Sequence, residues 1–134
     1  MSKKYSLDRL SDIIPAISRP SLVFLYGDLW AGKTTISQSI IQKELGEDKN
    51  ITSPTYVYYN KYSDIYHFDL YRCSDYDEFV SIWWEEILDN NEGIILVEWP
   101  QILKKYYTPD IEIYIEKIDD ESDNRHIDLK YKKV

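Results

Sequence analysis

The chain has 134 residues, enough for one domain but too few for two. Of these residues 43% are hydrophobic and 30% are charged, a composition typical of a soluble globular protein. Its net charge of −8 argues against tight binding of nucleic acid by this chain alone, because an acidic surface repels phosphate, so contact with RNA is expected only through a more basic partner. The single cysteine, Cys73, excludes an internal disulfide. The apolar runs are too short to span a membrane, and Asp8, Arg9 and Asp12 interrupt the apolar region that a signal peptide would need, so we expect a cytoplasmic protein.

The first part of the chain predicts a helix, a strand and a second helix. Ser6 can cap an amphipathic helix that Pro15 weakens. Residues 21–27 form a continuous apolar run ending in glycine, which is typical of a buried parallel strand. Helical spacing of isoleucines and leucine then predicts a helix over 33–45, which Gly46 is placed to end.

The rest of the chain predicts more strands than helices. The expected elements are a hairpin of 55–63 and 64–72 that turns at Ser63-Asp64, a helical stretch at 75–90, a buried strand at 93–100 broken by Pro100, and weaker strands at 111–117 and 126–131. A strand, a loop and a helix followed by further apolar strands indicate an α/β fold. We expect a single three-layer domain over 1–134, with a mostly parallel central sheet and an antiparallel hairpin.

Residues 27–34, GDLWAGKT, match the phosphate-binding pattern G-x-x-x-x-G-K-[ST] between an apolar strand and a helix. In this pattern the glycines let successive backbone N–H groups face a polyphosphate, and the helix N-terminus favours the anion. Lys33 is expected to meet the β and γ phosphates, and the Thr34 hydroxyl to bind Mg²⁺. The motif therefore predicts a P-loop NTPase-like nucleotide site.

Two carboxylates are candidates to complete this site. Glu98 ends the apolar run IILVE, where open α/β sheets place their ligand crevice, and can hold the Mg²⁺ shell or orient a water molecule. Without the loop, Glu98 would fit an ordinary polar residue at the end of a strand. In IYHFDLYR, alternation puts His67 and Asp69 on one face; Asp69 is the better metal candidate, and His67 fits a structural hydrogen bond.

The tyrosines between Tyr56 and Tyr76 leave two interpretations open. Tyrosine is favoured in strands, and it is also enriched at protein interfaces. The residues alone do not separate these explanations.

Four linked motifs together resemble the TsaE (YjeE) family, a small bacterial P-loop ATPase needed for making threonylcarbamoyladenosine in tRNA. The family reads GDLGAGKTT, SPTF, YHFDLYR and VEWPE in this order. The chain has GDLWAGKTT at 27–35, SPTY at 53–56, YHFDLYR at 66–72 and VEWPQ at 97–101. The resemblance covers nearly the whole chain, including the leading helix and a late Arg125.

The resemblance implies a site for ATP and Mg²⁺. Its nucleotide-binding residues would be Gly27, Asp28, Leu29, Trp30, Ala31, Gly32, Lys33, Thr34, Thr35, Thr55 and Trp99. In this arrangement Thr35 lies close to the α-phosphate, and Thr55, in a switch segment, faces the γ-phosphate and the metal. Thr34, Asp69 and Glu98 would hold Mg²⁺, and Lys33, Asp69 and Glu98 would be the catalytic residues.

The resemblance also implies partners. The family acts with the TsaB–TsaD pair, whose TsaD subunit transfers threonylcarbamoyl to the adenosine next to the anticodon. ATP binding and hydrolysis would cycle that machinery. Contact with tRNA would then be indirect, in agreement with the acidic charge.

Two tryptophans depart from the family pattern, because Trp30 and Trp83 stand where the family has glycine. If the loop needs a glycine-only conformation at position 30, a bulky residue there costs about 1–3 kcal/mol. One explanation is a genuine tryptophan whose ring faces outward. The other is a gene in which UGA codons, meant as glycine, were translated as tryptophan.

Two other functions stay open at this stage. A small P-loop kinase is the first, although such enzymes usually bring several arginines to the transferred phosphoryl group, and this chain has no arginine-rich lid segment. The second is a partner-binding scaffold in which Trp30 blocks the loop and no hydrolysis takes place.

Overall fold

The computed structural model describes residues 2–6, 14, 16–28, 31–46, 59–81, 84–118 and 124–132. Several predictions lie outside these residues: the helix after Ser6, the loop positions Leu29 and Trp30, the SPTY segment with Thr55, and Trp83.

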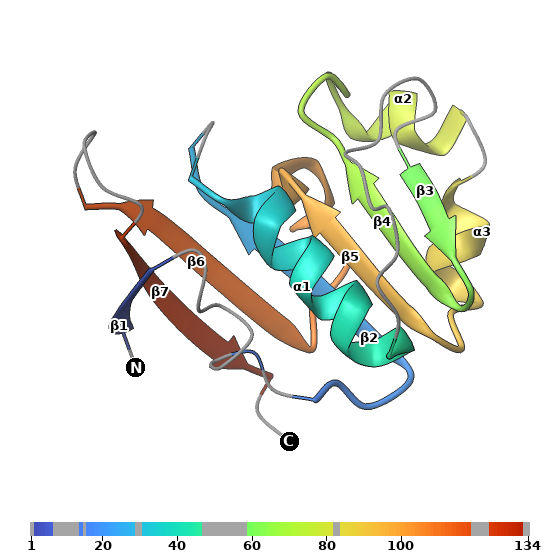
Figure 1. The fold of residues 1–134 in the computed structure, drawn as a ribbon. Coiled ribbons are helices and arrows are strands. Elements are labelled where there is room, and N and C mark those ends of the chain that lie inside the picture. Colours follow the sequence, from blue (N-terminus) through green and yellow to red (C-terminus); the bar gives the residue numbers. More distant parts are fainter. Residues whose placement is uncertain are drawn as a thin grey trace.

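The described strands form one mixed sheet. They are β1 (Ser2–Ser6), β2 (Ser21–Tyr26), β3 (Tyr59–Tyr62), β4 (Ile65–Asp69), β5 (Ile94–Glu98), β6 (Ile111–Lys117) and β7 (Asn124–Tyr131). Their order across the sheet is β1-β7-β6-β2-β5-β4-β3 (Figure 1). The four central strands run parallel, and antiparallel partners extend both edges. The predicted α/β fold with a parallel centre and an antiparallel hairpin is confirmed.

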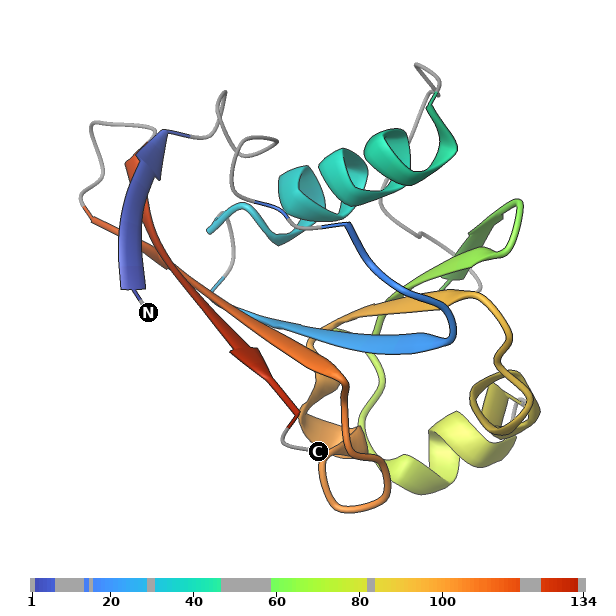
Figure 2. The same ribbon diagram turned by 90° about the horizontal axis from the view of Figure 1, so that it is seen from below.

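Helices cover both faces of the sheet. Helix α1 (Lys33–Leu45) lies on one face, and α2 (Tyr76–Ser81), α3 (Trp84–Asp89) and the 3-10 helix η2 (Pro100–Leu103) lie on the other (Figure 2). Alternate side chains of β2 belong to two hydrophobic cores: Val23 and Leu25 pack on the α1 side of the sheet, and Phe24 packs on the other side. The predicted three layers are therefore present. No helix in the described part of the chain is long and apolar enough to cross a membrane.

Local signals placed several elements correctly. Helix α1 has the predicted bounds, and Gly46 ends it with φ of 67° and an N–H that donates to the carbonyl of Gln42. The hairpin of β3 and β4 turns at the predicted Ser63-Asp64, where Ser63 has φ of 57°. The helical stretch at 75–90 contains α2 and α3 as two short helices.

Strand β1 was not predicted. Its sequence, SKKYS, shows no apolar alternation, and Ser6, the expected helix cap, is its last residue. The strand pairs antiparallel with β7, with Tyr5 opposite Arg125. Its conformation therefore depends on a partner from the far end of the chain.

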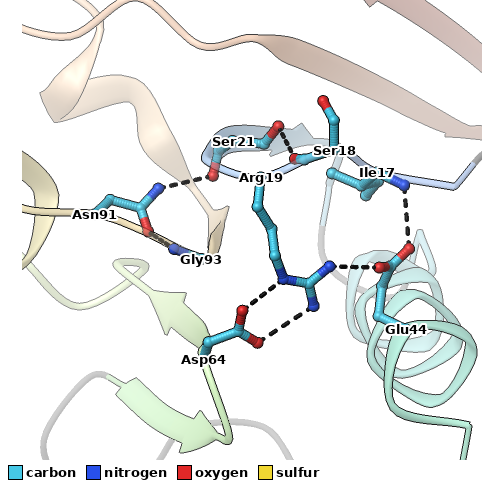
Figure 3. A network of polar contacts seen from close by, with 8 residues as sticks. All are labelled: Ile17, Ser18, Arg19, Ser21, Glu44, Asp64, Asn91 and Gly93. Atoms are coloured by element: carbon cyan, nitrogen blue, oxygen red, sulfur yellow. Dashed lines mark hydrogen bonds and ion pairs between the residues drawn. The ribbon is translucent and has the colours of Figure 1, made fainter.

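Arg19 forms a clamp between α1 and the turn of the β3–β4 hairpin, at the end of the sheet where the parallel strands begin (Figure 3). Its guanidinium lies 2.5 Å from Asp64 Oδ2, in the hairpin turn, and 2.9 Å from Glu44 Oε1, in the last turn of α1. The hydrogen bonds with Arg19 lower the pKa of the Asp64 carboxyl. This clamp lies away from the carboxyl ends of the strands, where a ligand site is expected.

Candidate functional site

Two glycines shape the loop between β2 and α1. Gly32, immediately before α1, has φ of 115° and ψ of 17°, a conformation that residues with a side chain rarely adopt. Gly27 allows close packing, because a Cβ there would lie 2.7 Å from the carbonyl oxygen of Ile115 on β6. The first N–H groups of α1 have no partner within the helix, and the N-terminus of α1 therefore favours an anion.

The Lys33 side chain turns back into this loop. Its Nζ donates to the carbonyl oxygens of Gly27 at 2.5 Å and Asp28 at 2.8 Å, and it lies 4.3 Å from the centre of the Trp99 ring. Lys33 is only 5% exposed, and burial lowers the pKa of its ammonium, against the opposing effect of the Glu98 charge. An anion entering the loop would meet a partly desolvated positive charge.

A chain of hydrogen bonds joins the loop to the sheet through Glu98. Thr34 Oγ1, in the first turn of α1, lies 3.0 Å from Glu98 Oε1 and 3.2 Å from Glu98 Oε2. On the other side, His67 Nε2, from β4, lies 2.5 Å from Glu98 Oε2. Glu98 is 2% exposed and His67 is fully buried, so the hydrogen bond between them is shielded from solvent, whereas Thr34 is half-buried.

Asp69 brings a second carboxylate to the same place. It ends β4 as the register partner of Glu98 on β5, and its Oδ1 accepts a hydrogen bond from the N–H of Tyr71 at 3.0 Å. Burial raises the pKa of Asp69, and the neighbouring charge of Glu98 raises it further. Two carboxylates thus sit side by side at the carboxyl ends of adjacent parallel strands.

Trp99 borders the site in an unusual backbone conformation. It follows β5 with φ of 58°, and residues other than glycine that adopt this region are often found at functional sites. Its ring packs against Tyr71, with the ring centres 4.8 Å apart. Of the other predicted residues, Thr35 lies half-buried in the first turn of α1 and Ala31 is buried in the loop.

A cavity of about 500 Å³ opens beside Gly27 and Asp28, lined in part by Tyr26, Trp99 and Tyr114. These aromatic rings belong to the core on the sheet face opposite α1. Strand β2 lies between β5 and β6, so later strands of the chain were added on both sides of it. The crevice at the carboxyl end of such a strand is the usual place for ligands in open α/β sheets.

Comparison with known proteins decides the family. Residues 2–127 match the family described as threonylcarbamoyl adenosine biosynthesis protein TsaE. The chain belongs to the TsaE family. Curated TsaE proteins, named tRNA threonylcarbamoyladenosine biosynthesis protein TsaE, include one from Rickettsia felis, 38% identical over 84% of this chain and 68% of its own length. Another, from Haemophilus influenzae, is 37% identical over 81% of this chain and 68% of its own length.

A solved structure has the same fold. The crystal structure of YdiB from Bacillus subtilis aligns with a TM-score of 0.63 and 26% identity, over 98% of this chain and 86% of the YdiB chain. The family match and the curated relatives confirm the resemblance to the TsaE family, which is involved in the biosynthesis of threonylcarbamoyladenosine in tRNA.

The sequence resemblance included Arg125, but its contact with the loop of this TsaE-family chain was not predicted. Arg125, on β7, is 4% exposed, and its Nε donates to the carbonyl oxygen of Ala31 at 2.6 Å. Alternation along β7 offers a signal, because Arg125 shares its face with the buried Ile127. The bond between His67 and Glu98 was also missed, although a structural hydrogen bond was expected for His67.

Proposed function

We propose that this TsaE-family chain binds ATP with Mg²⁺ and hydrolyses it. One observation carries the proposal: the hydroxyl of Thr34, from the phosphate-loop motif, bonds directly to the buried carboxylate of Glu98 at the end of β5. A loop hydroxyl paired with a strand-end carboxylate is the arrangement that holds Mg²⁺ in P-loop NTPases.

The donor atoms at this place fit Mg²⁺. Thr34, Asp69 and Glu98 offer hydroxyl and carboxylate oxygens, the ligands that this ion prefers. The described residues contain no cluster of three or more His, Cys, Asp or Glu that could hold a metal by itself. Mg²⁺ is usually bound by one or two carboxylates together with substrate phosphates and water.

Each residue of the proposed site has a distinct task. Lys33 leaves its carbonyl partners and neutralises the β and γ phosphates, while the backbone of residues 27–34 surrounds them. Mg²⁺, when bound, offsets the charge that develops on the phosphate oxygens. Glu98 and Asp69 hold the metal shell and orient the attacking water, and Trp99 and Thr35 border the nucleotide. Leu29, Trp30 and Thr55 lie outside the described residues, and their part in this site stays a prediction.

The partners follow from the family. We propose that hydrolysis by this chain, acting as one domain in the cytoplasm, cycles the TsaB–TsaD pair, and that tRNA is reached only through that complex. The net charge of −8 supports indirect contact with tRNA.

The direct test measures Mg²⁺-ATP binding and hydrolysis by the full chain, with and without the cognate TsaB–TsaD pair. Glu98→Gln is the diagnostic variant, because it keeps the shape of the side chain and removes the charge. We expect it to lower single-turnover hydrolysis more than it weakens binding. Neither binding nor hydrolysis of ATP by the wild type, even with the partners, would favour the partner-binding scaffold instead.

A further inference from the structure

His67 contacts the site from the central sheet. It lies on β4, within the parallel centre of the sheet, and is fully buried. Its Nε2 lies 2.5 Å from Glu98 Oε2, a short hydrogen bond. A carboxylate only accepts hydrogen bonds, so Nε2 carries the proton and donates it.

The other ring nitrogen indicates that this contact is specific. His67 Nδ1 is buried and has no hydrogen-bond partner among the described residues. A histidine kept for general stability of the fold is expected to have both nitrogens satisfied, because an unpaired buried polar atom destabilises the fold. The hydrogen bond that the structure gives this side chain is the one to Glu98.

Glu98 needs such a second contact. Its side chain has three rotatable bonds, and Thr34 approaches both carboxylate oxygens from the loop side at similar distances of 3.0 and 3.2 Å. Thr34 alone therefore distinguishes poorly between the two oxygens. Because His67 binds Oε2 from the sheet side, it orients the carboxylate so that Oε1 faces the loop.

We propose that His67 is a positioning residue that fixes the orientation of the Glu98 carboxylate, which in turn would hold Mg²⁺ and orient the attacking water. The proposal rests on the proposed Mg²⁺-ATPase function. His67 touches neither nucleotide nor metal in this arrangement, and it acts through Glu98. Partners that orient a metal-binding side chain typically change metal affinity or activity by about 10- to 100-fold when they are removed.

The test compares two substitutions in the full chain. His67→Leu replaces the hydrogen-bond donor with an apolar side chain, whereas His67→Gln keeps an N–H donor at a similar distance from the backbone. We expect His67→Leu to lower kcat for ATP hydrolysis by about 10- to 100-fold with less than about threefold change in KM, and His67→Gln to recover most of the activity. Ile65→Val is the matched control, a buried substitution two residues away on the same face of β4 that should leave kcat unchanged.

A double-mutant cycle separates positioning from a general effect on the fold. If His67 acts through Glu98, adding His67→Leu to Glu98→Gln should lower the remaining activity by less than about twofold. Losses that multiply in the double variant would overturn the proposal, as would wild-type kcat in His67→Leu or a parallel loss in Ile65→Val.

A second readout does not require turnover. The Mg²⁺ concentration that gives half-maximal binding of a non-hydrolysable ATP analogue should rise about tenfold or more in His67→Leu, with unchanged affinity for the analogue without Mg²⁺. An unchanged Mg²⁺ requirement would overturn the role of His67. A wild type that binds the analogue in a Mg²⁺-dependent manner but hydrolyses no ATP would refute only the proposed hydrolysis.

Discussion

Asp69 and Glu98 are register partners at the carboxyl ends of the adjacent parallel strands β4 and β5. The pairing continues one residue further, where the N–H of Leu70 donates to the carbonyl oxygen of Glu98 at 3.0 Å. Two carboxylates are thereby held side by side in a largely buried place. Like charges in such a place destabilise the folded state, and a pair that is kept at this cost in stability is a candidate for a functional role.

Asp69→Asn should increase stability and decrease activity. The raised pKa of Asp69 means that the folded protein holds this proton more tightly than the unfolded chain, so ionised Asp69 lowers stability above its pKa. The amide removes that cost, and Tm at pH 7 should rise. Single-turnover hydrolysis should fall at least about tenfold, equivalent to about 1.4 kcal/mol of transition-state stabilisation. A lower Tm, or equal losses of binding and hydrolysis, would point to a structural role.

Lys33→Met should abolish nucleotide binding without unfolding the protein. Methionine fills the buried space and removes an ammonium whose pKa is lowered by burial, so Tm should stay the same or rise. Affinity for Mg²⁺-ATP should fall at least about 100-fold, or about 2.7 kcal/mol. Calorimetric titration and thermal unfolding of the same preparation check both expectations. ATP hydrolysis at the wild-type rate would refute the assignment of the loop.

The clamp at Arg19 predicts a pH-dependent contribution to stability. Hydrogen bonds with Arg19 hold the pKa of Asp64 below its usual value of 3.8, so the ionised carboxylate stabilises the fold at neutral pH. Asp64→Asn should therefore lower stability at pH 7 by at most about 1 kcal/mol, the usual range for exposed ion pairs. The difference should shrink as pH falls through the folded-state pKa of Asp64, and it should also shrink in high salt. Denaturant unfolding at pH 7 and pH 2.5, and at pH 7 in low and high salt, measures both effects, and a difference as large at pH 2.5 as at pH 7 would contradict its origin in this ion pair.

Arg125→Met should weaken nucleotide binding through the loop. The substitution removes the donor to the Ala31 carbonyl while keeping an unbranched side chain in the buried space. We expect affinity for Mg²⁺-ATP to fall about tenfold, or about 1.4 kcal/mol. Arg19→Met is the matched control, because it breaks an arginine contact at the opposite edge of the parallel strands and should lower Tm with unchanged affinity. Equal affinities for Arg125→Met and wild type would show that the loop keeps its shape without this bond.

Trp30→Gly should leave Mg²⁺-ATP affinity unchanged or increase it. Glycine lets the loop backbone approach phosphate closely, and it relieves any strain that a tryptophan causes there. The gene itself provides an independent check. UGA codons at positions 30 and 83 with UGG at 99 would support glycine as the native residue at both places, whereas UGG at 30 and 83 would make both tryptophans genuine. A clear loss of affinity in Trp30→Gly would instead give the tryptophan ring a part in binding.

Features that depend on neighbours a few residues away could be predicted from the sequence. The periodicity of residues 33–45 and the glycine after them predicted α1 and its end, because helix contacts and caps are local. Alternation in IYHFDLYR placed His67 and Asp69 on one face of β4 for the same reason. The spacing of the loop motif and the carboxylates at the ends of two strands predicted which side chains form the candidate site.

The contacts between these side chains could not be predicted in the same way, because they join distant parts of the chain. Thr34 and Glu98 are 64 residues apart, and Ala31 and Arg125 are 94 apart, so neither contact leaves a pattern within one element. Strand β1 likewise exists through its pairing with β7, because its own residues show no strand period. Such contacts depend on the order and register of the strands, which bury His67 against Glu98 and set two carboxylates side by side through the packing of the whole sheet.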